Sequence, residues 1–228
     1  AVRSEIIKKE LPVLLGITFF AAWQLLDQQV SKDDAFSLLG LFVLLISWSI
    51  WHGMQGSKDA LADEYSEELN TTEGTVKTHV IWLIAGLLLL VASSRMLVWG
   101  AVEVAGFFGV SDTIIGLTVI AIGTSLPELA SSLIAVKKGE HDLALGNVIG
   151  SNMFNTLAVV GIAGTIQPMA VSADFLYRDV IVMLAATVAL FVFCIGIKRQ
   201  GRLNRLEGGV LVAAYTGYTY WLITAAFI

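Results

Sequence analysis

Residues 115–130 read IGLTVIAIGTSLPELA and place a carboxylate, three hydroxyls and a proline inside an apolar stretch. Glu128 is the one charged residue between Asp112 and Lys137, so it falls near the middle of the bilayer if the segment spans the membrane. A carboxylate at that depth is costly, and an acid inside the membrane is therefore expected to have a function. The stretch predicts a functional site within a membrane-spanning segment.

Pro127 predicts that this segment is a broken helix. Proline has no backbone N–H and its ring clashes with the carbonyl four residues back, so we expect the Gly123 oxygen to be free. Broken backbone at membrane depth is tolerated only where it is buried or lines a cavity. Thr124 and Ser125 precede Glu128 by four and three residues and are expected to share its helical face. Such oxygen ligands suit calcium or sodium, so we interpret the cluster as a cation site.

The composition is that of a membrane protein. Hydrophobic residues make up 56% of the 228 residues and charged residues 14%, far from the balance of a soluble domain. Because about 20 apolar residues cross the hydrocarbon core, we expect an all-α polytopic membrane protein with seven spans. Their predicted ranges are 10–27, 35–54, 79–102, 112–136, 142–166, 175–197 and 207–227.

The distribution of basic residues predicts the orientation of these spans. With alternating connections, eleven Lys and Arg residues fall on the side of the N-terminus and two, Lys32 and Arg178, on the other. Basic residues mark cytoplasmic loops, so the N-terminus of the chain is predicted to be cytoplasmic and the C-terminus external. The net charge of −5 arises largely from an acidic loop at 56–78. This charge and the lack of a basic stripe argue against nucleic-acid binding.

The chain also contains an internal repeat. Residues 1–15 align without gaps to residues 170–184, so that acids match acids and Lys9 matches Arg178. The first copy enters the membrane from one side and the second, five crossings later, from the other, as in the inverted repeats of secondary transporters. Residues 79–169 precede the second copy, whereas nothing precedes the first. We therefore expect about 90 upstream residues, three spans with a partner motif, to be absent from this sequence.

A second polar motif opens the span after Glu128. Asn147, Ser151 and Asn155 recur at every fourth position within GNVIGSNMFN (146–155) and form a polar stripe on one helical face. Gly146 and Gly150 are small residues four apart, a spacing that lets another helix approach closely. Taken alone, the motif reads as a packing interface. Beside the Glu128 stretch, it is better interpreted as a second contributor to the cation site.

Together, GTSLPE (123–128) and GSNMFN (150–155) closely resemble the second alpha repeat of the calcium/cation antiporter superfamily, most of all its prokaryotic sodium/calcium exchangers. The resemblance implies ten spans in two inverted five-span halves. On that pattern residues 1–55 hold the last two spans of the first half, 56–78 the acidic cytoplasmic loop, and 79–228 the second half with its ion-binding motifs. It also implies the cation ligands, with Glu128 as the principal one: Glu128, Thr124, Ser125, Ser151 and Asn155.

The resemblance implies a secondary antiporter that exchanges Ca²⁺ for Na⁺ by alternating access. Its partners are these two ions, the lipid bilayer, and either the missing N-terminal spans or a complementary chain; no resident cofactor is expected. A bacterial or archaeal inner or plasma membrane is the expected location. Some relatives carry an acid where this chain has Asn155, which leaves the exact ions and their stoichiometry open, including Ca²⁺/H⁺ or K⁺-dependent exchange. A half-transporter or a non-transporting membrane subunit is the alternative of a different class. The motifs HExxH and GxSxG are absent from the sequence, and an enzyme is not expected.

Overall fold

The computed structural model describes residues 4–54, 76–109, 115–195 and 203–226. Most of the predicted acidic loop therefore lies outside the described residues. The chain divides into two compact units, one formed by residues 1–67 with 139–203 and the other by 68–138 with 204–228. Each unit is described by itself below.

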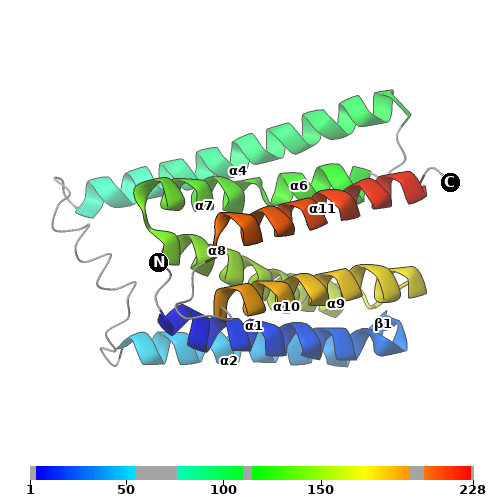
Figure 1. The fold of residues 1–228 in the computed structure, drawn as a ribbon, viewed down its shortest axis with the longest axis horizontal. Coiled ribbons are helices and arrows are strands. Elements are labelled where there is room, and N and C mark those ends of the chain that lie inside the picture. The colour runs from blue at the N-terminus through cyan, green and yellow to red at the C-terminus, as the bar shows by residue number, and fades with distance from the viewer. Residues whose placement is uncertain (1–3, 55–75, 110–114, 196–202, 227–228) are drawn as a thin grey trace. The chain divides into compact units, whose positions relative to one another are not determined.

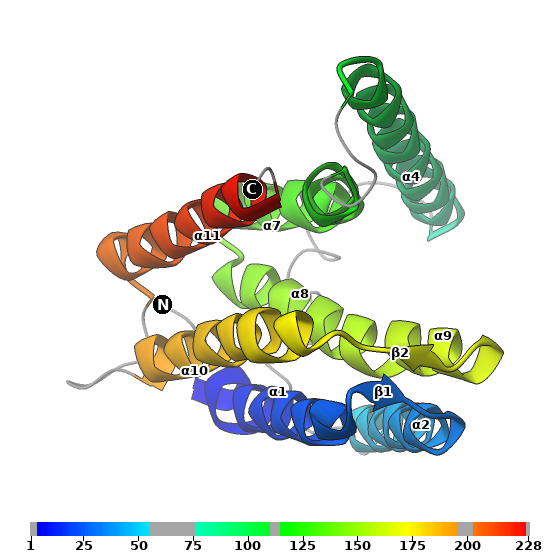
Figure 2. The same cartoon turned by 90° about the vertical axis from the view of Figure 1, so that its right-hand side faces the viewer.

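The first unit is a helical bundle whose elements come from two separate stretches of the sequence, before and after residues 68–138 of the second unit (Figures 1 and 2). Its elements are α1 (Ser4–Gln24), a 3-10 turn (Leu25–Asp27), β1 (Gln29–Val30), α2 (Lys32–Met54), α8 (His141–Phe154), the π-helical turn η3 (Asn155–Val159), α9 (Val160–Ile166), β2 (Met169–Ala170), the π-helical turn η4 (Phe175–Val180) and α10 (Ile181–Ile195). Long apolar helices joined by short turns are what the spacing of hydrophobic runs predicts.

Helices α1 and α10 pack antiparallel in this unit. Near the start of α1, Leu11 and Leu14 are buried in one cluster with Cys194 at the end of α10. Near the end of α1, Ala22 is buried against Leu176 and Val180, which open the η4–α10 segment. Opposite ends of the two helices therefore meet, as Figure 2 also shows.

Two glycines of α9 allow a close approach to α2. A Cβ added to Gly161 would lie 2.8 Å from Leu39 Cγ, and one added to Gly164 would lie 2.9 Å from Ala35 Cβ. Both distances are too short for real side chains, so only glycine fits at these positions. Small residues at such interfaces let helix backbones pack tightly where no hydrophobic effect drives association.

A short strand pair joins two turns of the same unit. Gln29 pairs with Ala170 and Val30 with Met169 in an antiparallel arrangement, and Val171 N donates to Gln28 O at 2.8 Å. The pairing fixes the turn between α1 and α2 beside the turn that leads from α9 to α10. Both turns consequently lie at the same end of the bundle.

The second unit contains the long helix α4 and the segment that carries Glu128. Its elements are α4 (Val76–Phe107), the π-helical turn η2 (Gly116–Ile120), α6 (Ala121–Thr124), α7 (Leu126–Lys138) and α11 (Arg205–Ala226). Helix α4 has 32 residues and extends the span predicted at 79–102 by more than a turn at its far end. The reason is that residues 103–107 continue in a helix, with no proline to end it.

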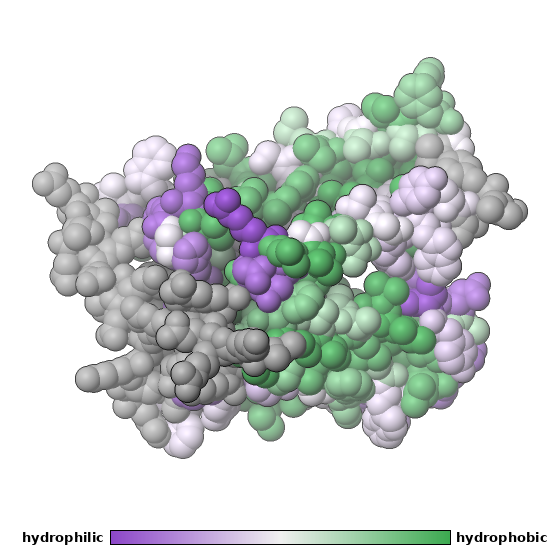
Figure 3. Space-filling model, viewed as in Figure 1, coloured by the Kyte–Doolittle hydropathy of each residue, from purple (hydrophilic) through white to green (hydrophobic). Residues whose placement is uncertain are grey.

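Five helices are long and apolar enough to cross a membrane, and the bent pair around Ser125 makes a sixth candidate, when only the described residues are considered. Helix α11 covers the seventh predicted span but is not among these candidates, so that span stays a prediction. Large apolar side chains are widely exposed, such as Trp82 (74%) and Leu89 (71%) on α4. Apolar residues cover much of the face drawn in Figure 3, as expected of surfaces that contact lipid.

Candidate cation-binding site

The helix that carries Glu128 is broken at Ser125. Helix α6 ends at Thr124, Ser125 has φ −93° and ψ 1°, and α7 begins at Leu126. The two parts are bent by 45°. Pro127 occupies the first turn of α7, where a missing N–H costs no helical hydrogen bond. The break that Pro127 predicts is confirmed.

The Gly123 carbonyl has a partner, contrary to the expectation that it is free. Ser94 of α4 donates its Oγ proton to Gly123 O at 2.7 Å. Gly123 is buried, and a Cβ on it would lie 2.1 Å from Val98 Cγ2, so α4 passes directly over this residue. The sequence gives no sign of this bond because Ser94 lies 29 residues away, within an apolar helix.

The three predicted ligands of this segment do not share one continuous helical face. Thr124 belongs to α6, where its Oγ1 donates to Ile120 O at 3.0 Å, whereas Glu128 belongs to α7. The bend between them invalidates the four-residue spacing of an unbroken helix. Ser125 stays close to Glu128 along the chain, because its carbonyl accepts the Leu129 N–H at 3.0 Å and so begins α7.

Glu128 lies in the first turn of α7. The side chain is half-buried and its Oε2 atom is buried. The partial positive charge at a helix N-terminus stabilises a carboxylate in this position. Thr124 and Ser125 are exposed next to it along the chain. The second unit thus presents one carboxylate and two hydroxyls at a helix break, a set of hard oxygen atoms of the kind that Na⁺ and Ca²⁺ bind.

The second motif lies on a helix that continues without a break. Ser151 is on α8, with its Oγ donating to Val148 O at 3.2 Å, and Asn155 begins η3. Asn155 is exposed and Ser151 half-buried. A π-helical turn inside an α-helix is often found at a functional position. The expectation that Ser151 and Asn155 lie on one helical span is consistent with this geometry.

Gly146 and Gly150 do not serve here as close helix contacts. A Cβ added to either glycine would meet nothing within 4 Å. Both residues instead line a cavity of about 400 Å³ together with apolar side chains of α1 and α2, such as Val13 and Phe42. The close approach predicted from their spacing is therefore not realised within the first unit.

The five predicted ligands fall in different units. Thr124, Ser125 and Glu128 come together in the second unit, and Ser151 and Asn155 in the first. Their assembly into one site stays a prediction. In the described parts of the chain, no three Asp, Glu, His or Cys side chains gather as metal ligands.

Comparison with known proteins identifies the family to which this arrangement belongs. The sequence profile described as "Sodium/calcium exchanger protein" matches residues 78–224, which include both polar motifs. The chain belongs to the sodium/calcium exchanger family. The resemblance of residues 123–128 and 150–155 to calcium/cation antiporters is therefore confirmed.

Individual members of this family are similar over most of the chain. The putative antiporter CaxA of Alkalimonas amylolytica is 46% identical over 226 residues, which cover 99% of this chain and 70% of CaxA. The sodium/calcium exchanger MaX1 of Methanosarcina acetivorans is 42% identical over 118 residues, covering 52% of this chain and 34% of MaX1. These relatives are named as transporters, and the sodium/calcium exchanger family is one of membrane transporters rather than enzymes.

The fold is also that of a solved exchanger. The sodium-calcium exchanger NCX_Mj, in crystals soaked with Na⁺ and Ca²⁺, superposes with a TM-score of 0.73 at 25% sequence identity. The match covers 95% of this chain and 65% of NCX_Mj, so the chain spans about two thirds of that exchanger. The protein is thus an integral membrane protein with the fold of a prokaryotic sodium/calcium exchanger.

Proposed function

We propose that the protein is a secondary antiporter that exchanges Ca²⁺ for Na⁺ through a site in the middle of the membrane. The proposed ligands are Glu128, Thr124, Ser125, Ser151 and Asn155. The observation that carries the proposal is the break at Ser125, which places Glu128 at a helix start within an apolar segment of an exchanger-family chain.

The charge of the site explains how two ions compete for it. A site that holds either one divalent or several monovalent cations must supply negative charge that both states neutralise. Glu128 supplies one negative charge, so a second acid is needed to balance Ca²⁺. We expect that acid in a first motif, contributed by N-terminal spans or a complementary chain. Exclusive occupancy by Na⁺ or Ca²⁺, together with alternating access, then couples the two gradients.

An inverted repeat is supported by the antiparallel packing of α1 and α10. The alignment of residues 1–15 with 170–184 extends to Thr18 and Thr187. Thr18 Oγ1 donates to Leu14 O at 2.8 Å, and Thr187 Oγ1 donates to Met183 O at 2.9 Å. Thr216 of α11 makes the same bond to Val212 O, so these bonds are common to helices and the packing of the two helices carries the support. The antiparallel packing of α1 and α10 is what an inverted repeat requires of these two helices.

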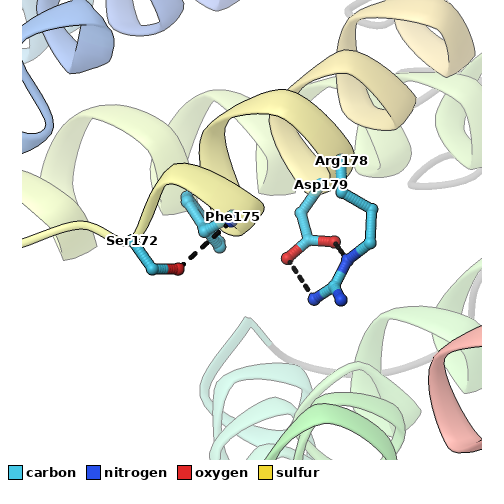
Figure 4. Close-up of polar contacts among 4 residues, drawn as sticks. All are labelled: Ser172, Phe175, Arg178 and Asp179. Atoms are coloured by element: carbon cyan, nitrogen blue, oxygen red, sulfur yellow. Dashed lines mark hydrogen bonds and ion pairs between the residues drawn. The ribbon is translucent and has the colours of Figure 1, made fainter. Parts of the chain in front are cut away.

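A charged pair at the aligned positions 9–10 and 178–179 gives the same support. Lys9 and Glu10 align with Arg178 and Asp179. Arg178 Nε lies 2.6 Å from Asp179 Oδ1, and a second nitrogen of the guanidinium donates to Oδ2 at 3.1 Å (Figure 4). A bidentate pair compensates both charges and makes them compatible with a position near the membrane surface.

The strand pair supports a single crossing by the broken helix. Because β1 pairs with β2, the chain must cross the membrane an even number of times between them. Three of the intervening elements, α2, α4 and the α8–α9 helix, are candidate spans. If each crosses once, the bent pair of α6 and α7 also crosses once, as a broken span rather than a re-entrant loop. This count agrees with the proposed orientation, in which both turns face outward and the N-terminus is cytoplasmic.

Transport by the intact protein in liposomes tests the proposal. Vesicles loaded with Na⁺ and diluted into Na⁺-free buffer containing radioactive Ca²⁺ are expected to accumulate Ca²⁺, and dissipation of the Na⁺ gradient should stop the uptake. Ca²⁺ uptake that depends on a pH gradient and not on Na⁺ would identify H⁺ as the coupling ion. A strict requirement for K⁺ would indicate K⁺-dependent exchange. Purified protein that neither binds nor moves Ca²⁺ would point to a non-transporting membrane subunit.

A further inference from the structure

A serine of α4 contacts the backbone at the break in the Glu128 helix. Ser94 Oγ lies 2.7 Å from the carbonyl oxygen of Gly123, two residues before Ser125. Ser94 is half-buried and Gly123 is buried. Pro127 is four residues after Gly123 and has no N–H to offer this carbonyl. The serine hydroxyl thus donates to this carbonyl beside the backbone N–H of Ser125 and adds a bond from α4 where the proline removes a helical one.

The same helix packs tightly on Gly123. Val98 lies one turn after Ser94 on α4, and a Cβ at Gly123 would lie 2.1 Å from its Cγ2 atom. The next atom of Val98, its Cβ, would be 3.4 Å away, which is close to ordinary contact. The glycine therefore lets α4 come near enough for the serine to reach the carbonyl. Two residues one turn apart fix α4 against the end of α6.

The hydrogen bond acts on the peptide that leads into the predicted ligands. The Gly123 carbonyl and the Thr124 N–H belong to one planar peptide unit. Holding the oxygen consequently fixes the orientation of the plane from which Thr124 and Ser125 follow. Without the Ser94 hydroxyl, the carbonyl would keep the Ser125 N–H of the turn itself but would lose its bond to α4.

The neighbouring serine shows that the feature is specific to one residue. Ser93 is exposed, and its Oγ donates to Leu89 O of its own helix at 2.6 Å. It has the same chemistry and the same helix as Ser94, but its hydrogen bonds to Leu89 O and Leu90 O stay within α4. The difference between the two serines isolates the contact with Gly123.

We infer that Ser94 is a positioning residue for the cation site: its hydroxyl holds the Gly123 carbonyl and so sets the geometry of Thr124 and Ser125. The inference rests on the proposed function, since it takes these two residues as ligands. Ser94 itself is not a ligand. Its loss should weaken the binding of ions more than it slows the transport of bound ions.

The test compares Ser94→Ala, Ser94→Thr and the control Ser93→Ala in the intact protein reconstituted in liposomes. Ser94→Ala is expected to raise the KM for Ca²⁺ about three- to tenfold, the equilibrium change that one hydrogen bond typically contributes, with a smaller change in maximal rate. Ser94→Thr keeps a hydroxyl and should restore most of the affinity, and Ser93→Ala should match the wild type. An unchanged KM in Ser94→Ala, or equal effects of Ser93→Ala and Ser94→Ala, would overturn the inference.

Two measurements without transport separate this inference from the proposed function. Hydrogen exchange of the amides in residues 118–130 should accelerate in Ser94→Ala but not in Ser93→Ala. Gly123→Ala should lower the thermal unfolding temperature, and adding Val98→Ala should recover part of the loss because it removes the clashing Cγ2 atom. If wild-type protein shows no Na⁺-driven Ca²⁺ uptake, the proposed function fails, while the amide hydrogen-exchange result still decides whether Ser94 positions the break and the unfolding temperatures decide whether Gly123 packs on Val98. Unchanged amide hydrogen exchange of residues 118–130 in Ser94→Ala contradicts the positioning role.

Discussion

The two helical segments that carry the polar motifs both contain polar residues within an apolar stretch, but their backbones differ. The segment from Gly116 to Lys138 is broken and bent, and its first part ends at Thr124, directly after a buried glycine that is hydrogen-bonded to another helix. The segment from His141 to Ile166 stays continuous through a π-helical turn at Asn155. A broken helix can offer backbone groups and a carboxylate at a helix start, whereas a continuous one can offer only side chains.

The difference teaches that polar residues alone do not break a helix in an apolar segment. Asn147, Ser151 and Asn155 are as many as the three polar residues next to Pro127, yet their helix persists because every backbone N–H is present. The Ser151 hydroxyl and the Asn152 side-chain amide both donate to the Val148 carbonyl, at 3.2 and 2.7 Å. We therefore expect substitutions at the break to affect ion binding more strongly than substitutions on the continuous helix.

The largest effect is expected for Glu128→Gln. Removing the carboxylate's charge while keeping its shape should reduce Na⁺-driven Ca²⁺ uptake to background with little change in thermal unfolding. The matched control is Glu103→Gln, which changes the exposed acid of α4 and should leave uptake near the wild-type rate. If Glu128→Gln took up Ca²⁺ at the wild-type rate, Glu128 would not be a ligand. The broken helix would then not contribute more to ion binding than the continuous one.

Pro127→Ala should have the next largest effect. An alanine supplies an N–H to the Gly123 carbonyl and favours a continuous helix, so the predicted ligands are displaced. We expect the apparent affinity for Ca²⁺ to fall about tenfold, as for other changes that disturb the orientation of metal ligands. The control is Pro12→Ala in α1, the other proline inside a helix. Equal Ca²⁺ titrations for Pro127→Ala and the wild type would show that the break is not needed.

Asn155→Asp tests whether the continuous helix also contributes to ion binding. A second carboxylate attracts a divalent ion more than a monovalent one, so the affinity for Ca²⁺ should rise at least about fivefold relative to that for Na⁺. Asn152→Asp is the control, because the Asn152 amide bonds to Val148 O of its own helix. Competition between Na⁺ and radioactive Ca²⁺ measures the ratio. An identical shift in both variants would indicate a general field effect and not a ligand at Asn155.

The smallest effect is expected for Ser151→Ala. It removes one neutral oxygen, so the KM for Na⁺ should rise about threefold, near the contribution of a single hydrogen-bonding group. Thr165→Ala removes a hydroxyl from the far end of the same segment, where it bonds to Ile162 O, and should leave the KM unchanged. If Ser151→Ala lost as much Ca²⁺ uptake as Glu128→Gln, the continuous helix would contribute to ion binding as strongly as the broken one.

The sequence predicts the membrane fold and the break because both follow from local chemistry. Apolar runs of sufficient length specify the helices, and Pro127 specifies where one of them stops. The polar motifs are also sufficient to recognise the family. By contrast, the prediction that Thr124 and Glu128 share one helical face is wrong, because a spacing of four residues places side chains on one face only in an unbroken helix.

Contacts between distant segments are what sequence reasoning misses. The bond from Ser94 to Gly123 joins residues in different helices, and a serine in an apolar helix commonly bonds to its own backbone, as Ser93 does. The spacing of Gly146 and Gly150 likewise indicates a helix contact but does not specify a partner. Such features depend on tertiary packing, which no local pattern encodes.

The length of α4 has a consequence for the lipid. Its 32 residues extend over about 48 Å, whereas the hydrocarbon layer is about 30 Å thick. Such hydrophobic mismatch is relieved by helix tilt or by local thickening of the bilayer. Ser94 lies near the midpoint of α4 and is attached to Gly123, so a change of tilt pivots the helix about this contact. Acyl-chain length is then expected to modulate the ion site from within the bilayer.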